Sequence, residues 1–479
     1  MDKRLTLPYI IFTDKERMTN SRTSSSFKRL FALLTVACSL MAASDSLAAD
    51  RHIRPSNDVT YNGDGTSWAA AASAGAPGAY KGLPSASTLI RGDVYYIADG
   101  AYPGQTFNRA ASGTTPITIR KATPANHGST TGWSDTFGDG QATFSSQLQF
   151  TTRYWVIDGV VGGGPPPSGS GTSTWKTGHG FKVTETRGTP VIWVNGGGDV
   201  DIRHIDLQGA GDDGSPGGIG NDGLQVYNGQ GPVTLSHAYV HDMGRVMFYH
   251  GGGSAASITA SHSYFGKHES VGAEHSEFAV LRSNALFTLR WSIITHTEGT
   301  GGIIAGDNGQ TTAEIYGNVF YRDGSTIWGT ENNGLIAAFS ANSAPVNWKV
   351  YNNSFINIPS NLSVFGVAGQ NPAGNEARNN LYYLSTNHRP GSGWTQSYEH
   401  FSDSGTATGS NSSTSSGDPF GNYVSYNFRL KGNTPPGTPL PAPFNIDMYG
   451  RQRTTWSRGA IELDDSSLNP PTNLRTVGQ

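Results

Sequence analysis

Six ten-residue segments between residues 200 and 357 share one pattern of apolar and polar positions. Their first residues lie 33, 25, 29, 26 and 35 positions apart. The third and eighth positions are apolar in almost every copy, for example Leu235 with Val240 and Ile315 with Phe320. Aligned without gaps, the segments are VDIRHIDLQG (200–209), VTLSHAYVHD (233–242), ITASHSYFGK (258–267), FTLRWSIITH (287–296), AEIYGNVFYR (313–322) and WKVYNNSFIN (348–357). Further short apolar segments lie between the copies, so each repeat contains two or three strands.

This periodicity predicts a parallel β-helix. A strand turns successive side chains to opposite faces, and a unit of two or three strands cannot bury its apolar row alone. Stacking the units about 4.8 Å apart pairs their backbone groups and joins the apolar rows into one core. The irregular spacing predicts loops of different length on one side of the stack.

The fifth position of the repeat carries flat rings, in His204, His237, His262 and Trp291. We expect these rings to stack in successive turns as a structural feature, rather than to act in catalysis. Asn318, Asn352 and Asn353 fall just past the first strand of their repeats, where stacked side chains can hydrogen-bond along a turn. The low-complexity segment 402–418 is expected to be a long loop or a mobile segment.

Segments outside the repeat resemble the pectin-lyase-like right-handed parallel β-helix superfamily, and within it the alginate lyase and chondroitinase B group of polysaccharide lyases. The resemblance covers most of residues 88–385 and a closing segment. It is carried by the opening coils GDVYYIADGAYPGQTF (92–107), PITIRKAT (116–123) and YWVIDGV (154–160), and by DMYGRQR (447–453) with RGAIEL (458–463). It implies an all-β, right-handed parallel β-helix, as a single domain with a capping N-terminal segment.

The chain is accordingly expected to have four parts. They are a signal peptide and leader (1–49), a parallel β-helix (50–400) with opening coils at 88–160, a C-terminal coil and closing segment (401–465), and a linker-like tail (466–479).

The N-terminus resembles a signal peptide. Lys28 and Arg29 precede the apolar run LFALLTVACSLMAA, and small residues lead to a cleavage site near Ala48. The run is too short for a membrane span. The only cysteine, Cys38, lies inside it, so the mature chain has no disulfide. We therefore expect a secreted protein, extracellular or periplasmic, and a monomer.

Composition excludes some partners and favours others. Charged residues are 14% of the chain and the formal net charge is −3, with no basic run or stripe. This excludes an electrostatic nucleic-acid interface. An acidic polysaccharide is the expected partner, because cations gather locally at one position of the repeat.

That position is the tenth, where each repeat meets a variable loop. It holds Asp242, Lys267, His296, Arg322 and Asn357. Two interpretations stay open: an exposed charge ladder between Asp242 and Lys267, which would contribute about 0–1 kcal/mol, or a saccharide-binding cleft. In the second, the predicted substrate-binding residues are Tyr227, Asp242, Arg245, Tyr249, His250 and His296.

The stretch EFAVLRSNALFTLRWSIITHTEGTGG (277–302) resembles the lyase segment that carries the catalytic pair. Arg282 stands where the family's lysine base is expected, and Ile304 or Ala305 where its arginine acid is expected. Arginine stays protonated, so it is a poor base. Either Lys267 or a histidine of the loop HESVGAEHSE (268–277) has taken over, or the scaffold does not cleave.

The predicted catalytic residues are therefore Lys267, His268, His275 and Arg282. The strand register is open, since the inward pair is either Phe278 with Val280 or Ala279 with Leu281. A slip of one residue moves Arg282 between the turn and the groove.

No cofactor motif is present. Oxygen ligands for Ca²⁺ occur in GDDG (211–214), Asn221 with Asp222, Asp242, and Glu274 with Glu277. Because acidic residues in turns are usually turn-forming, the metal remains an open alternative.

The first hypothesis is an exported polysaccharide lyase that cleaves uronate-containing glycan by β-elimination. The alternatives are a non-catalytic glycan-binding surface or matrix protein, and a glycoside hydrolase using Asp222 and Asp242.

Overall fold

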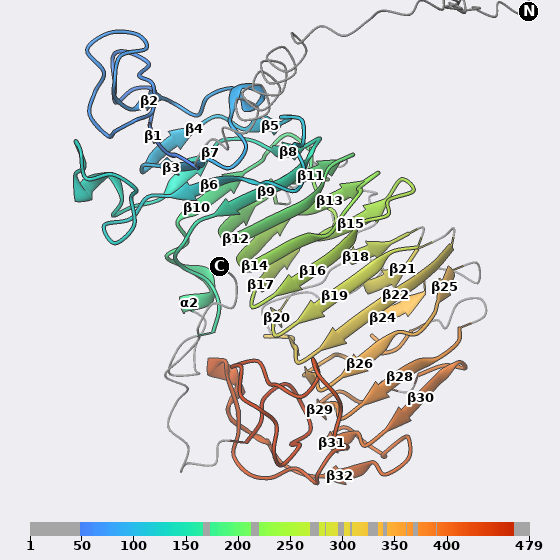
Figure 1. Ribbon diagram of the computed structural model, residues 1–479. Coiled ribbons are helices and arrows are strands. Elements are labelled where there is room, and N and C mark those ends of the chain that lie inside the picture. The colour runs from blue at the N-terminus through green and yellow to red at the C-terminus, as the bar shows by residue number, and fades with distance from the viewer. Residues whose placement is uncertain are drawn as a thin grey trace, which may run out of the picture. The chain divides into compact units, whose positions relative to one another are not determined.

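The computed structural model describes residues 48–165, 173–211, 220–282, 284–295, 301–306, 309–323, 334–338, 343–360, 362–366, 372–388 and 390–463, except for residues 269–276 and the side chains of residues 267 and 268. All of them belong to the compact unit Ala48–Gln479. Their strands form a 24-stranded sheet, an 8-stranded sheet and a two-stranded pair. The two large sheets are parallel and stack coil upon coil (Figure 1). The fold is the predicted all-β, right-handed parallel β-helix.

The 24-stranded sheet bends along its length into two faces. The first face contains β1(Asp50–Arg54), β2(Tyr80–Lys81), β3(Val94–Ile97), β6(Ile117–Lys121), β9(Arg153–Asp158), the first halves of β12(Gly198–Gln208) and β14(Val233–Met243), β16(Ser257–Ser261), β19(Leu286–Arg290), β22(Gly309–Tyr316), β25(Ser343–Pro345), β26(Lys349–Tyr351), β28(Asn375–Arg378) and β30(Trp394–Ser397). The second face contains β4(Gly100–Tyr102), β7(Ala142–Phe144), β10(Phe181–Thr184), the second halves of β12 and β14, β17(Tyr264–His268), β20(Ile293–Ile294), β23(Val319–Tyr321), β27(Ser354–Ile356), β29(Leu381–Tyr383), β31(His400–Ser402) and β32(Ser413–Ser415).

The 8-stranded sheet is the third face. It contains β5(Gln105–Phe107), β8(Leu148–Phe150), β11(Ile192–Asn195), β13(Leu224–Tyr227), β15(Phe248–Gly251), β18(Glu277–Leu281), β21(Gly301–Ala305) and β24(Ile336–Ala338). Outside the stack lie α2(Ser173–Lys176), the 3-10 turns η1(Ala86–Thr88), η2(Asp135–Phe137) and η3(Tyr423–Ser425), and the antiparallel pair β33(Phe420–Asn422) and β34(Asn427–Leu430). Each coil runs from the first face to the second, and then through a loop of variable length to the third.

The corner between the first and second faces is made by the fifth position of the repeat. His204, His237, His262 and Trp291 all have positive φ, between 48° and 56°. Asn and His enter this left-handed region more readily than most residues, which explains their use at the corner. Their rings stack at centroid distances of 4.7, 5.2 and 5.0 Å in successive coils. The predicted structural ring stack is confirmed.

An amide ladder runs beside this corner. The backbone N–H of Ser292 donates to Asn318 Oδ1 at 3.0 Å, and that of Asn318 donates to Asn353 Oδ1 at 3.0 Å. Asn353 N–H then donates to Asn380 Oδ1 at 2.9 Å. The predicted hydrogen-bonding stack is confirmed for Asn318 and Asn353. Asn352 instead takes the left-handed corner and donates to the carbonyl of Phe444.

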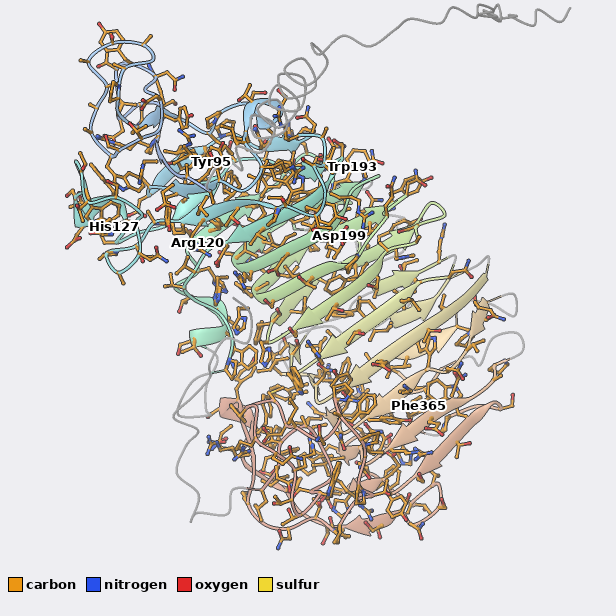
Figure 2. All side chains as sticks on the ribbon, viewed as in Figure 1. Tyr95, Arg120, His127, Trp193, Asp199 and Phe365 are labelled. Carbon is orange, nitrogen blue, oxygen red and sulfur yellow. The ribbon has the colours of Figure 1, made fainter. Side chains whose placement is uncertain are left out.

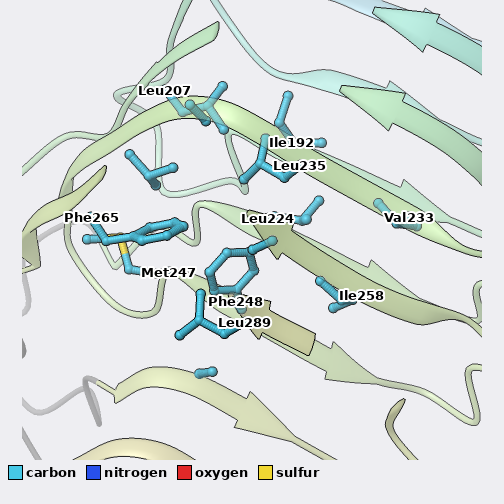
Figure 3. Close-up of a cluster of buried hydrophobic side chains, with 14 of the residues drawn as sticks. Ile192, Leu207, Leu224, Val233, Leu235, Met247, Phe248, Ile258, Phe265 and Leu289 are labelled. Atoms are coloured by element: carbon cyan, nitrogen blue, oxygen red, sulfur yellow. The ribbon is translucent and has the colours of Figure 1, made fainter. Parts of the chain in front are cut away.

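The core fills the space between the three faces. Third-position residues such as Leu235 and eighth-position residues such as Phe265 are fully buried, as the pattern predicts. Phe248 of the third face packs against Phe265, with ring centroids 5.3 Å apart (Figure 3). It also packs against Phe287, with centroids 5.5 Å apart. Burying such side chains contributes roughly 1.5–3 kcal/mol each.

Residues 402–418 are not one long loop. Ser413–Ser415 form β32, which pairs in parallel with β31 and adds a further rung. The predicted loop is wrong here because serine and threonine side chains fit the pleated outer surface of a solenoid as well as they fit a loop. The parallel stack thus extends to Ser415, within the expected C-terminal coil.

The C-terminal segment covers the second face of the later coils. Phe428 packs edge-on against Tyr321 of β23, with ring centroids 5.5 Å apart, and the backbone N–H of Ala460 donates to Ser354 Oγ of β27. Phe444 packs edge-on against Tyr316 and Tyr351 at the neighbouring ends of the first-face strands β22 and β26, with centroids 4.8 and 5.0 Å apart. The buried guanidinium of Arg453 donates to the carbonyls of Gly459 and Ala460. This segment therefore closes the second face of the later coils. In the described part of the chain, no helix is long and apolar enough to cross a membrane.

Candidate functional site

The outer surface of the third face carries one row of side chains, with one residue from each rung. In-register pairing aligns Gln149 with Trp193, Trp193 with Gln225, and Gln225 with Tyr249. Neighbouring strands lie about 4.8 Å apart, so these side chains form a continuous polar and aromatic strip. Trp193 is labelled in Figure 2.

A hollow of about 270 Å³ opens beside this row, where the loops from the second face arrive. Its lining comes from three successive coils: Gly188, Pro190, Gly220, Asp222, Gln225 and Arg245. A concave polar surface of this size suits one or two sugar residues better than a flat face does.

Arg245 is held at the hollow by a buried carboxylate. Its Nε and Nη2 donate to the two oxygens of Asp222 at 2.7 and 2.5 Å, and Asp222 is 1% exposed. The Arg245 guanidinium also lies 5.5 Å from the centre of the Tyr249 ring. A bidentate pair fixes a guanidinium plane, so Asp222 positions Arg245 against the tyrosine.

Arg282 approaches the same ring from the next coil. Its guanidinium lies 5.6 Å from the centre of Tyr249, and the side chain is exposed. Tyr249 therefore lies near two guanidinium groups, an arrangement that cation–π attraction stabilises by about 0.5–1 kcal/mol at exposed sites. Of the two, Arg245 lines the hollow, on a chain whose net charge is −3.

The register around Arg282 is now fixed. Ala279 pairs with Phe248 and Leu281 with His250, and both belong to the core, whereas Val280 pairs with Tyr249 of the outer row. The inward pair is therefore Ala279 with Leu281. This places Arg282 directly after β18, at the end of the strand where it can reach Tyr249.

Tyr227 lies at the corresponding end of β13, in register with Gly251. It is 40% exposed, and its ring lies so close to Gly252 that a Cβ on that glycine would meet it at 2.6 Å. The structure thus brings Tyr227, Arg245, Tyr249 and Arg282 to one outer face. Their predicted roles with substrate stay predictions.

His250 lies elsewhere. It is 0% exposed, and its ring nitrogens lie 3.0 Å from the carbonyl oxygen of Arg282 and 2.8 Å from that of Ala256. Burial lowers the pKa of His250, against these hydrogen bonds. The predicted contact with substrate does not fit this position, because the alternation of β15 sends His250 inward when Tyr249 points outward. Ile304, at the position of the family's acid, is buried as well.

Asp242 belongs to a different cluster, at the end of β14 on the second face. His241 bridges two carboxylates, with Nδ1 2.7 Å from Asp242 Oδ2 and Nε2 2.9 Å from Asp206 Oδ1. Burial opposes a charge on His241, but these hydrogen bonds raise its pKa. The Tyr239 ring stacks on the imidazole at 4.0 Å. Asp242 therefore lies at the corner from which the loop to Arg245 departs.

Lys267 and His268 end β17, where His268 pairs with Met243, so Lys267 lies level with Asp242. Their side chains, and His275 and His296 altogether, lie outside the described residues. The predicted catalytic roles of Lys267, His268 and His275, and the choice between a charge ladder and a cleft at the tenth position, stay untested.

The position of Asp222 argues against the hydrolase alternative. A glycoside hydrolase needs both carboxyl groups facing the scissile bond. The two oxygens of Asp222 face Arg245, and the group is buried.

Calcium remains a prediction. Among the described residues, no three His, Cys, Asp or Glu side chains are placed to share a metal ion. Asp212, Asp213 and Glu274 of the predicted ligands lie outside the described residues.

Sequence reasoning missed Trp193, Gln225 and the Asp222–Arg245 pair as parts of one surface. The signal for Trp193 is present in IWVN (192–195), where the tryptophan is the outward residue between two core residues. Its alignment with Gln225 and Tyr249 depends on pairings between strands about thirty residues apart, which no local pattern specifies.

The chain is similar to several solved structures at low sequence identity. No family model matches the sequence, and no curated protein matches it. Similar solved structures include pectate lyase Pel9A (13% identity, 88% of this chain and 98% of that chain, TM-score 0.47), the PL6 family alginate lyase AlyGC (13%, 88% and 59%, 0.34) and the PL6 family polysaccharide lyase Pedsa3628 from Pseudopedobacter saltans (10%, 75% and 97%, 0.35). At TM-scores under 0.5 this likeness carries no argument about the fold or the activity of this chain.

Proposed function

We propose that the chain is an exported polysaccharide lyase that cleaves uronate-containing glycan by β-elimination on the outer surface of the third face. The observation that carries the proposal is the exposed Arg282 guanidinium over Tyr249, beside the hollow that Arg245 lines. An exposed arginine beside an aromatic ring and a hollow offers a sugar both a carboxylate partner and a stacking surface.

β-Elimination needs three groups. One neutralises the uronate carboxylate, a second removes the proton from the carbon beside it, and a third protonates the leaving oxygen as the C–O bond breaks and a C=C bond forms. Arg282 suits the first role because it is permanently charged and can bind a carboxylate through two N–H groups. Lys267 is proposed as the base, with His268 and His275 as the alternatives. A positioned base contributes about 10²–10⁴-fold to the rate.

Tyr249 is proposed as the stacking platform, and its phenol as the group that meets the leaving oxygen. Tyr227, Arg245 and His296 complete the proposed substrate-binding set, and Asp242 is left out because it lies at the Asp206–His241 cluster of the second face.

The test incubates the protein, processed near Ala48, with alginate, pectate, hyaluronan and chondroitin, with added calcium and with a chelator. Ultraviolet absorbance of unsaturated product and reducing ends are followed together. A lyase raises both signals, whereas a hydrolase raises reducing ends alone. Binding without either signal would favour the non-catalytic alternative.

Lys267→Ala is expected to abolish cleavage with little change in melting temperature. Thr259→Ala, an outward residue of the first face, is the matched control. Full activity in Lys267→Ala would refute the assignment of the base. Intact-mass measurement of the exported protein checks processing near Ala48.

A further inference from the structure

The amide ladder reaches a carboxyl group in the last coils. Asn380, which accepts from the backbone N–H of Asn353, donates from its own Nδ2 to Glu399 Oε1 at 3.2 Å. The backbone N–H of Glu399 donates in turn to Ser412 Oγ at 3.1 Å. Glu399 therefore takes the ladder position at the corner between β30 and β31, where the earlier coils have asparagine. Unlike asparagine, it can ionise.

This carboxyl group lies in the core and is incompletely paired. Glu399 is 0% exposed, and among the described residues its Oε2 has no hydrogen-bond partner. The same holds for the phenol oxygen of Tyr382, which lies beside the carboxyl group and is also 0% exposed. The Tyr382 ring stacks between Phe355 and Phe401, with centroids 5.2 and 4.7 Å apart. The surroundings of Glu399 are thus aromatic on this side.

The nearest guanidinium group holds the backbone of the corner and does not contact the carboxyl group. Arg458 Nη1 donates to the carbonyl oxygen of Glu399 at 2.7 Å and to Ser413 Oγ at 2.9 Å. Its Nη2 donates to the carbonyls of Asn411 and Pro436. The charge of Arg458 favours ionisation of Glu399 only from a distance, because its N–H groups are directed to neutral oxygens.

Two histidines near this corner add no cation at neutral pH or face elsewhere. The His388 ring lies 5.3 Å from the Tyr382 ring, and its Nε2 lies 2.9 Å from a backbone carbonyl oxygen. His400 has both ring nitrogens near hydroxyl groups, those of Ser413 and Ser415. Burial lowers the pKa of His400 to about 4, so this imidazole is neutral at pH 7.

These contacts favour the protonated form of Glu399. An ionised carboxylate with an unpaired oxygen loses its hydration in the core without compensation, whereas a carboxylic acid loses far less. Burial accordingly raises the pKa of Glu399 well above its ordinary value, against hydrogen bonds from Tyr382 and Asn380 and the charge of Arg458. A carboxylic acid also resembles an amide, since it has one accepting oxygen and one donor.

We propose that Glu399 is a neutral carboxylic acid in the folded protein at pH 7, and that loss of this proton opens the last coils, β30 to β32, from the stack. The amide ladder would then end in a proton-binding site that makes closure of these coils sensitive to alkaline pH. The inference does not depend on the proposed function, because the corner lies outside the candidate site.

The direction of the pH effect follows from proton linkage. Opening exposes Glu399 to water, where its carboxyl group has the ordinary pKa of 4.5 and releases its proton. A group whose pKa is raised in the folded state stabilises that state fully below pH 4.5, and the contribution is lost as the pH rises through the raised pKa. In this interval each pH unit favours opening by up to about 10-fold.

Hydrogen exchange with mass spectrometry tests the opening of β30 to β32 between pH 5 and pH 9. Wild type is compared with Glu399→Gln, which keeps an accepting oxygen and a donor but does not titrate. The opening constant of wild type relative to the variant is expected to rise by at least about 10-fold over this range. Peptides covering β6 and β9 should give a constant ratio. A constant ratio for β30 to β32 as well would overturn the proposal.

The matched control is Glu314→Gln. Glu314 lies on the outer surface of the first face, 30% exposed and 2.8 Å from Lys349 Nζ, so its replacement should leave the opening of β30 to β32 unchanged at every pH. A pH-dependent ratio of the same size in this control would overturn the assignment to Glu399.

Infrared spectroscopy of wild type at pH 7 measures the proton itself and needs no variant that folds. The exposed carboxyl groups are ionised at this pH, so a carbonyl band of a protonated carboxylic acid is expected from Glu399. The band should disappear in Glu399→Gln and as wild type is titrated to alkaline pH. A spectrum of wild type that contains carboxylate bands alone rejects the proposal.

Discussion

At the residue scale, the account depends on the direction in which each side chain of the third face points. Arg282 was identified from a resemblance at the end of a strand, but the sequence left its register open. Pairing of Ala279 with Phe248 settles that register. His250 was predicted on the wrong side of its strand for the same reason. Side chains alternate between the core and the outer surface, and the pattern alone does not say which alternate residues face the core when Tyr, His and Val are found on either side. The site could thus be predicted in part, as a group of cations and aromatics near residues 227–282.

Arg282→Gln tests the role of the exposed guanidinium. Loss of a charged hydrogen bond of about 1.5–3 kcal/mol predicts that kcat/KM for a uronate polymer falls by about 10- to 100-fold. Arg282→Lys keeps the charge without the bidentate geometry, so its loss should be smaller. Arg203→Gln removes an arginine from the first face and serves as the control. Equal kcat/KM values for Arg282→Gln and wild type would show that Arg282 does not bind the substrate.

At the element scale, the sequence predicted the features that recur in every coil and missed a strand that lacks the pattern of the repeat. The ring stack and the amide ladder recur at fixed positions, so alignment of the repeats identified both. β32 was missed because its serines and threonines have neither an apolar period nor a turn signal. Repeated elements are predictable from sequence because the same physical requirement, a left-handed corner and a paired backbone, is met in each coil.

Asn353→Ala tests the amide ladder. The side chain accepts from Asn318 N–H and donates to the carbonyl of Ile315 at 2.8 Å, and it is fully buried. Its removal leaves buried backbone groups without partners, at a cost of about 1–3 kcal/mol for each group. We expect a destabilisation of about 2–4 kcal/mol in chemical denaturation. The exposed Asn387→Ala should change stability by less than about 0.5 kcal/mol. Similar values for the two variants would contradict a structural role for the ladder.

At the scale of the whole molecule, the half-buried His237 and His262 make stability depend on pH. Burial lowers the pKa of His237 to about 3 and that of His262 to about 4, from an ordinary value of 6.5. At a pH between the lowered pKa of each folded-state histidine and the ordinary value of 6.5, the unfolded chain binds more protons than the folded chain. The free energy of unfolding therefore rises with pH in this interval. The contribution is complete above about pH 6.5 and is lost as the pH falls towards 4. The raised pKa of His241 acts in the opposite direction.

His262→Asn separates this effect from general acid unfolding. Asparagine does not titrate, and Asn352 occupies the equivalent left-handed corner in a later coil. The melting temperature of the variant should fall less than that of wild type between pH 7 and pH 4.5. Parallel curves for the two proteins would show that His262 does not contribute to the acid sensitivity.

The central claim is that glycan lies along the outer surface of the third face. It is tested most directly by a crystal structure of Lys267→Ala soaked with a hyaluronan hexasaccharide. The account predicts sugar density over Tyr249, with a carboxylate at Arg282. Sugar bound on the first face, or across the Asp206–His241 cluster with the third face empty, would contradict it.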